Sequence, residues 1–90
     1  MTGLRLRTDA LEWREVEGEI VALDVRSSEY LAINRTGAVL WPLLAAGTDR
    51  DALVAAVVGE FEVDEATAGR DVDGFVAALG EQDLLEPRSA

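Results

Sequence analysis

The sequence EYLAINRTGAVLW, residues 29–41, changes its hydrophobic period in the middle. Up to Ile33 it is rich in aromatic, aliphatic and β-branched residues, which favour a strand. Asn34 and Thr36 then supply two suitable helix N-caps, and the apolar side chains after them recur with helical spacing. The stretch therefore predicts a strand, residues 29–33, that passes directly into a helix.

Two further strands are predicted before this stretch. Residues 11–16 alternate apolar and polar side chains, and residues 19–26 are rich in β-branched residues and bounded by turn residues. Ser27-Ser28 is suitable as a hairpin connection to the third strand. We therefore expect a three-stranded antiparallel meander with residues 29–33 at its edge. Residues 1–10 carry little pattern and are expected to be a flexible segment or a short edge strand.

Three helices are predicted after the strands. The first is expected to end at Gly47, and Pro42 within it removes a backbone donor, which predicts a kink or a late start. The second is expected to begin near the capping sequence Thr48-Asp49-Arg50-Asp51 and to end at Gly59. The third is opened by Asp64. Its apolar stripe consists of Ala68, Val72, Phe75, Val76 and Leu79.

Three strands followed by three helices predict an α+β fold of the winged helix-turn-helix type, with a three-stranded antiparallel sheet followed by three helices. The chain has 90 residues, which suffices for one domain. We expect this domain to span residues 11–86, with residues 87–90 as a tail.

The composition argues against several classes of function. The chain has no cysteine and no histidine, so it lacks thiol and imidazole metal ligands and the usual general base. We therefore expect no enzymatic activity, no metal and no cofactor. The net charge of −10 disfavours nucleic-acid binding, which depends on basic residues. The sequence has no apolar signal segment and no stretch of membrane-spanning length, so we expect a cytoplasmic protein.

The predicted edge strand is a candidate binding surface. An edge presents unpaired N–H and C=O groups, and proteins usually protect it with charge, proline or brevity. Here Glu29 is the only charged residue. The other residues are apolar: Tyr30, Leu31, Ala32 and Ile33. One interpretation is that a partner peptide adds a fourth strand; the alternative is that the N-terminal segment or self-association covers the edge.

The third predicted helix offers a second wall. Beside its apolar stripe lies a flank of small residues with one carboxylate, namely Asp71, Gly74 and Ala78. Such a flank, next to Phe75, would let an extended chain lie close to the helix, with Asp71 available to a cation or a backbone amide. A glycine costs about 1 kcal/mol relative to alanine in a helix interior, so the alternative is that packing merely tolerates Gly74.

The two tryptophans are expected to have different roles. Trp41 lies in the middle of an apolar helix face and is expected in the core. Trp13 lies on a strand rich in glutamate, so we expect it to be partly exposed as a contact for a second protein.

From about Ile20 to Glu86 the chain resembles the PqqD-type peptide-recognition family. The resemblance rests mainly on Asn-Arg-Thr-Gly-Ala-Val-Leu-Trp at residues 34–41 and on Asp-Val-Asp-Gly-Phe at residues 71–75. Pro42 and Asp83 depart from the family, which more often has a polar helix former and a glycine at these positions.

The resemblance implies a winged helix-turn-helix that holds the leader peptide of a ribosomally made precursor as a strand, in the groove between the third strand and the third helix. The residues assigned to this contact are Glu29, Tyr30, Leu31, Ala32, Ile33, Asp71, Gly74, Phe75 and Ala78. The chain is similar to the standalone recognition proteins of lasso-peptide biosynthesis, which work with a separate leader peptidase and a macrolactam cyclase. The alternatives are the peptide chaperone of the pyrroloquinoline quinone pathway and a helix-turn-helix transcription regulator.

Overall fold

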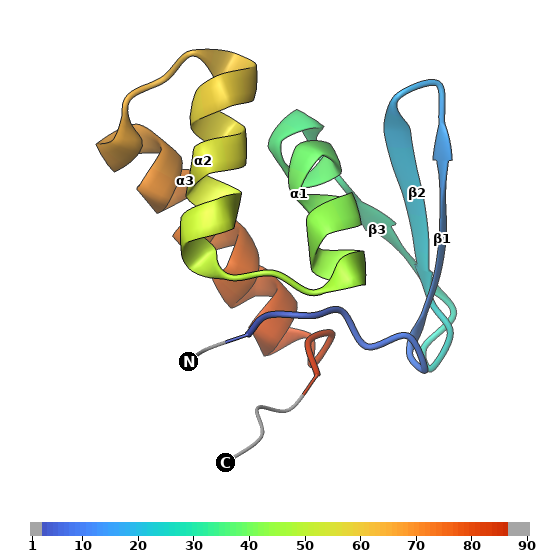
Figure 1. Ribbon diagram of the computed structural model, residues 1–90. Coiled ribbons are helices and arrows are strands. Elements are labelled where there is room, and N and C mark those ends of the chain that lie inside the picture. The colour runs from blue at the N-terminus through green and yellow to red at the C-terminus, as the bar shows by residue number, and fades with distance from the viewer. Residues whose placement is uncertain (1–2, 87–90) are drawn as a thin grey trace.

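A computed structural model describes residues 3–86 of the chain (Figure 1). It contains three strands followed by three helices, which confirms the predicted α+β fold. The strands are β1 (Leu11–Val16), β2 (Glu19–Asp24) and β3 (Glu29–Ala32). The helices are α1 (Arg35–Ala46), α2 (Arg50–Phe61) and α3 (Glu65–Glu81). The predicted tail, residues 87–90, lies outside the described residues.

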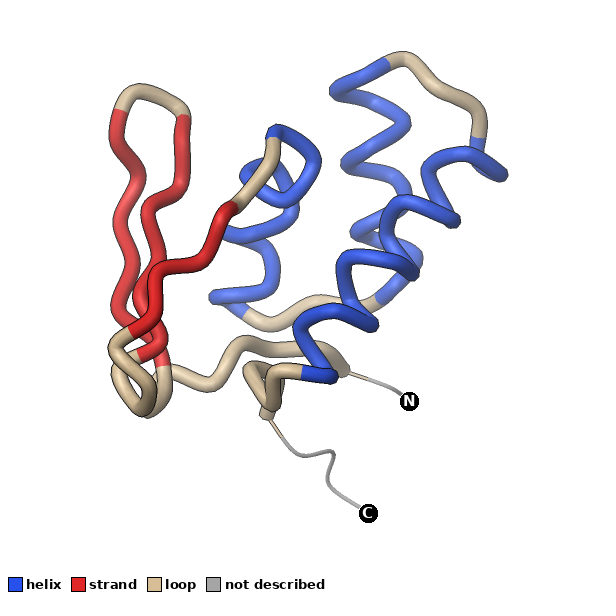
Figure 2. Tube along the Cα trace, turned by 180° about the vertical axis from the view of Figure 1, so that it is seen from behind, coloured by secondary structure: helices blue, strands red, loops and turns tan. Residues whose placement is uncertain are grey.

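The strands form one antiparallel sheet in the order β1-β2-β3, and the three helices lie on one side of it (Figure 1 and Figure 2). The register places Trp13, Ala22 and Leu31 in one row across the sheet. Ala22 is buried and Leu31 packs against the core, so this row faces the helices. Because side chains alternate between the two faces of a sheet, Tyr30 and Ala32 lie on the outer face.

Side-chain caps begin the three helices. Asp64 caps α3, as predicted, and Asn34, one of the two caps expected for the first helix, caps α1. Each Oδ1 atom accepts from the N–H three residues further on, at 2.8 Å for Asn34 and 2.7 Å for Asp64. Asp49, not Thr48, caps α2. The backbone of Thr48 is instead paired with that of Leu4 in both directions.

Two other boundaries differ from the prediction. The turn between β2 and β3 takes residues 25–28 rather than Ser27-Ser28 alone. α2 continues past Gly59 to Phe61, because a glycine weakens a helix without ending it when the next residues keep helical geometry. Pro42 lies inside α1, which begins at Arg35, so the late start, one of the two effects expected of this residue, does not occur.

Residues 1–10 were expected to be a flexible segment or a short edge strand; in the structure residues 3–10 form no strand of the three-stranded sheet. Leu4 forms a β-bridge with Thr48, and Leu6 forms one with Leu85. Leu6 is only 1 % exposed. The segment therefore connects the residues before α2 with those after α3.

The core is centred on Trp41, which is fully buried, as predicted. Two aromatic rings meet it edge-on, Trp13 at 6.1 Å and Phe75 at 6.5 Å between ring centroids. The other large buried side chains are those of Leu6, Leu40, Leu44, Leu53, Val57, Val72 and Leu84. One buried ring thus positions Trp13 on β1 and Phe75 on α3.

Candidate functional site

A groove with a volume of about 150 Å³ separates β3 from the C-terminal half of α3. Figure 2 shows β3 and α3 in front, on either side of α1, which lies behind them. The lining residues are Leu31, Ala32, Ile33, Asn34, Phe75, Ala78, Leu79, Gln82 and Leu84. None of these side chains is ionisable, so the groove is suited to an apolar ligand group flanked by a few hydrogen bonds.

The groove brings together five residues that were assigned to peptide binding. Leu31 and Ala32 belong to β3, and Ile33 follows it directly. Phe75 and Ala78 belong to α3. The apolar end of the predicted edge strand therefore faces the apolar stripe of the third helix, although they are about forty residues apart in the sequence.

The other four assigned residues lie around the groove without lining it. Tyr30 is 76 % exposed on the outer face of the sheet, and Glu29 is exposed at the start of β3. Asp71 is exposed one helical turn before Phe75, on the same side of α3. Gly74 is exposed, and nothing lies within 4 Å of the position that a β-carbon would take.

The opposite side of α3 packs against α2. Arg50 of α2 donates to Asp73 through Nε at 2.7 Å and through Nη2 at 3.1 Å. This hydrogen bonding lowers the pKa of the Asp73 carboxyl below its usual value. A β-carbon at Gly69 would lie 2.9 Å from Arg50 Nη2. With this side occupied, it is the Asp71, Phe75 and Ala78 side that faces β3.

Gly37 is a site residue that the sequence analysis missed. A β-carbon at this position would lie 2.7 Å from Cε1 and 2.9 Å from Cζ of Phe75, and 3.0 Å from Cγ2 of Ile33. The Phe75 ring can therefore take its position only because residue 37, in the first turn of α1, has no side chain. The signal was present in the sequence, as a glycine three residues after the cap Asn34, but its partner is remote along the chain.

The outer edge of β3 is open. Within residues 3–86, β2 is the one strand that pairs with β3. The N-terminal segment, which was the alternative cover for this edge, instead pairs with Thr48 and Leu85. The structure therefore leaves the backbone groups on this edge available beside an apolar groove.

Residues 3–86 contain neither a cluster of metal ligands nor a membrane-spanning helix. No three histidine, cysteine, aspartate or glutamate side chains lie close enough together there to hold a metal ion. No helix in that part of the chain is long and apolar enough to cross a membrane.

Comparison with known proteins gives two solved structures of similar fold and one family. TbiB1 in complex with the TbiA(β) leader peptide has a TM-score of 0.82 and 29% sequence identity, over 96% of this chain and 99% of that chain. Lasso peptide synthetase B1 complexed with the leader peptide has a TM-score of 0.78 and 30% sequence identity, over 93% of this chain and 98% of that chain. No curated protein matches the chain.

The family match covers most of the chain. Residues 19–85 match the family described as coenzyme PQQ synthesis protein D, PqqD. This range begins with β2 and ends just after α3, so it contains both walls of the groove. The chain therefore belongs to the PqqD family.

Proposed function

We propose that this chain is a non-catalytic adaptor that binds the leader peptide of a ribosomally made precursor as a fourth strand beside β3. The observation that carries the proposal is the open edge of β3 next to the apolar groove. It is supported by the two similar proteins, both of which are complexed with leader peptides. We further propose that the precursor is a lasso peptide, because one of these relatives is a lasso peptide synthetase B1 that matches 93% of this chain.

An added antiparallel strand would use main-chain hydrogen bonds for affinity and alternate side chains for specificity. Every second side chain of the leader would point from the edge of β3 towards Phe75 and Ala78. The groove volume of about 150 Å³ is of the size that holds one benzene-like group. One aromatic or branched apolar anchor would therefore fill it, and burying that side chain would contribute roughly 1.5 to 3 kcal/mol.

Charge around the groove favours a leader with basic residues beside its anchor. Asp71 and Glu29 are exposed near the groove, and the chain carries a net charge of −10. Exposed ion pairs contribute only about 0.2 to 1 kcal/mol each. Such charges would therefore mainly speed the capture of the leader.

We also propose that the bound leader is presented in the cytoplasm to a separate leader peptidase and a macrolactam cyclase. Trp13 is a candidate contact for one of them, because its ring is 38 % exposed while its position is held by Trp41. A rigid aromatic side chain that is partly exposed is typical of protein interfaces.

A second candidate function is that of the peptide chaperone in the pyrroloquinoline quinone pathway. The match to the family named after that coenzyme favours it. Both candidates use the same groove, and they differ in which precursor occupies it.

The Gly37→Ala substitution is expected to weaken leader binding by about tenfold. The added methyl group would displace the Phe75 ring, whose Cε1 atom lies 2.7 Å from its position, into the space that the anchor needs. Losing most of one anchor's burial corresponds to about 1.4 kcal/mol or more. Fluorescence anisotropy with a labelled leader peptide measures the loss.

Gly59→Ala is the matched control for this substitution. It makes the same change inside α2, where nothing lies within 4 Å of the new methyl group. It should leave binding unchanged and slightly stabilise the helix. Equal affinities of the Gly37→Ala variant and the wild type would contradict the assigned position of the anchor.

Direct titration tests the proposed function. The full chain is titrated into the fluorescein-labelled TbiA(β) leader peptide, into a leader from the precursor encoded nearest to this chain's gene, into scrambled versions of both, and into labelled duplex DNA. We expect saturable binding of a leader, no binding of the scrambled peptides and no binding of DNA. Binding of DNA but of neither leader would favour a transcription regulator instead.

A further inference from the structure

The end of α3 has an unusual residue in a turn that normally needs glycine. After the helix, Asp83 N–H donates to Gly80 O at 3.1 Å and Leu84 N–H donates to Leu79 O at 3.0 Å. This is the Schellman pattern, whose left-handed position is usually glycine. Asp83 occupies that position with φ of 57°. A residue with a β-carbon is disfavoured there, so its side chain is expected to have a compensating role.

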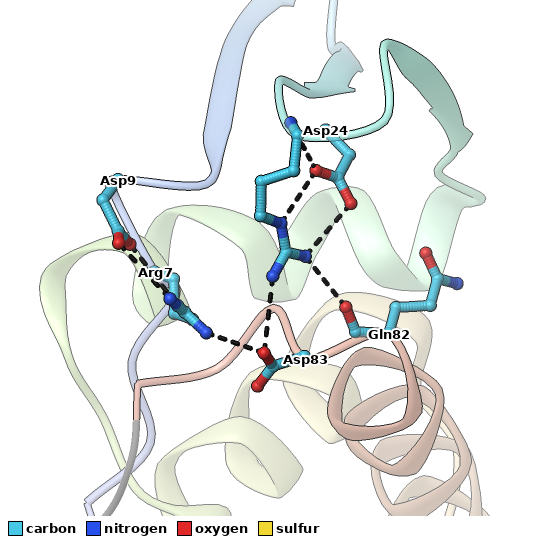
Figure 3. A network of polar contacts seen from close by, with 6 residues as sticks. Arg7, Asp9, Asp24, Gln82 and Asp83 are labelled. Atoms are coloured by element: carbon cyan, nitrogen blue, oxygen red, sulfur yellow. Dashed lines mark hydrogen bonds and ion pairs between the residues drawn. The ribbon is translucent and has the colours of Figure 1, made fainter.

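The Asp83 carboxylate joins two arginines from different parts of the chain (Figure 3). Its Oδ2 atom accepts from Arg7 Nη1 at 2.8 Å and from Arg26 Nη1 at 3.4 Å. Arg7 belongs to the N-terminal segment, and Arg26 lies in the turn between β2 and β3. A glycine in the same turn would make neither contact.

Arg26 connects this turn to the end of α3 through more than one bond. Its Nη2 donates to the main-chain carbonyl of Gln82 at 3.0 Å. Its guanidinium also donates to both carboxylate oxygens of Asp24 at 3.1 Å, and this contact lowers the pKa of the Asp24 carboxyl. Because Asp24 is only 8 % exposed at the end of β2, these bonds anchor Arg26 to the sheet.

These contacts lie at one end of the groove. Gln82 and Leu84, the neighbours of Asp83, both line the groove, and β3 begins three residues after Arg26. We propose that Asp83 is a positioning residue, which together with Arg26 fixes the separation between β3 and the C-terminal end of α3 at which a leader strand fits. The inference rests on the proposed function as far as the ligand is concerned, while the positioning itself is a property of the free protein.

The alternative is that Asp83 only stabilises the fold. Its side chain is 71% exposed, and ion pairs of exposed groups contribute little to stability. In the Asp83→Gly variant the lost ion pairs would be offset by a residue that is better suited to the left-handed turn. We therefore expect a melting temperature equal to or higher than that of the wild type, together with a loss of leader affinity of about five- to tenfold.

The test compares Asp83→Gly with Asp73→Asn, a control that breaks an exposed ion pair between α3 and α2 on the side away from the groove. Spin labels are placed on cysteines introduced at Tyr30 and Ala77, both exposed; the natural chain has no cysteine that would be labelled as well. Double electron–electron resonance then measures the distribution of distances between the label on β3 and the label on α3 in the free protein. Anisotropy with the fluorescein-labelled TbiA(β) leader and the precursor leader measures affinity in the unlabelled variants.

We expect a broader distance distribution and weaker leader binding for Asp83→Gly, and neither change for Asp73→Asn. An unchanged distance distribution in Asp83→Gly would overturn the positioning role, whatever the affinities for the leader peptides. A broader distribution with unchanged affinity would overturn the link to leader binding. If the wild type bound no leader, the proposed function would fail, and the positioning role would still be decided by the distance measurement.

Discussion

Replacing Ala32 with proline is expected to weaken leader binding by about 30- to 100-fold while leaving the domain folded. Proline has no N–H group to donate to an incoming strand, and its ring obstructs the edge on which that strand would pair. A main-chain hydrogen bond contributes about 0.5 to 1.5 kcal/mol net, so the loss of two or more corresponds to this range. Ala32 is the last residue of β3 and is exposed, which is a position where a sheet tolerates proline.

Ala32→Ser is the matched control, because it keeps the N–H group and changes only a small exposed side chain. Its affinity for the leader should stay within about twofold of the wild type, as surface substitutions usually change free energies by less than about 0.5 kcal/mol. Anisotropy titrations measure both variants, and circular dichroism verifies that each is folded. A folded Ala32→Pro variant that bound leader as tightly as the wild type would refute strand addition at β3.

The largest effect on stability is expected for Trp41→Ala. The indole is completely buried and lies between the rings of Trp13 and Phe75. Truncating a buried tryptophan typically costs about 3 to 5 kcal/mol. The total free energy of unfolding of a small domain is only about 5 to 15 kcal/mol. Urea denaturation should therefore show a variant that is largely or partly unfolded without denaturant.

Two milder substitutions separate what the Trp41 indole contributes to stability through its contact with Trp13 and through its Nε1 group. Trp13→Ala removes a ring that is 38 % exposed, so it should cost about 1 to 2 kcal/mol. Trp41→Phe keeps an aromatic ring in the core and removes the buried Nε1 donor, which has no hydrogen-bond partner among the described residues. An unpaired buried donor costs about 1 to 3 kcal/mol. Trp41→Phe should therefore be clearly less destabilising than Trp41→Ala, because it also keeps part of the buried aromatic surface; equal losses would contradict this packing of the core.

Local patterns were sufficient to predict the order of the elements. The switch of period within residues 29–41 predicted the passage from β3 to α1, and Asn34 and Asp64 marked the starts of two helices. Each of these signals depends on residues close together in the sequence, as hydrophobic periodicity and side-chain caps do.

The features that were missed depend on contacts between remote residues. Leu4 and Leu6 belong to a stretch too short for a recognisable period, and its partners are Thr48 and Leu85. The role of Gly37 depends on Phe75, thirty-eight residues later. Such pairings follow from packing, and no single segment contains both partners.

The candidate site was predictable in its two walls but not in its detail. The edge strand and the apolar stripe of the third helix indicated Leu31 and Phe75, which line the groove. Gln82 and Leu84 close its end, and they follow the helix in a turn shaped by Asp83. The sequence showed Asp83 only as a departure from the expected glycine, since Arg7 and Arg26 reach it from remote segments.

The most direct test of strand addition is a nuclear Overhauser experiment on the complex of isotope-labelled chain with unlabelled leader peptide. Strand addition predicts contacts between backbone protons of the leader and those of β3, from Glu29 to Ala32. It also predicts contacts from one apolar leader side chain to Phe75 and Ala78. Strand addition at β3 would be contradicted by a complex without contacts between the leader and the β3 backbone. In such a complex the leader would instead contact β1, the outer face of the sheet or the surface between α2 and α3.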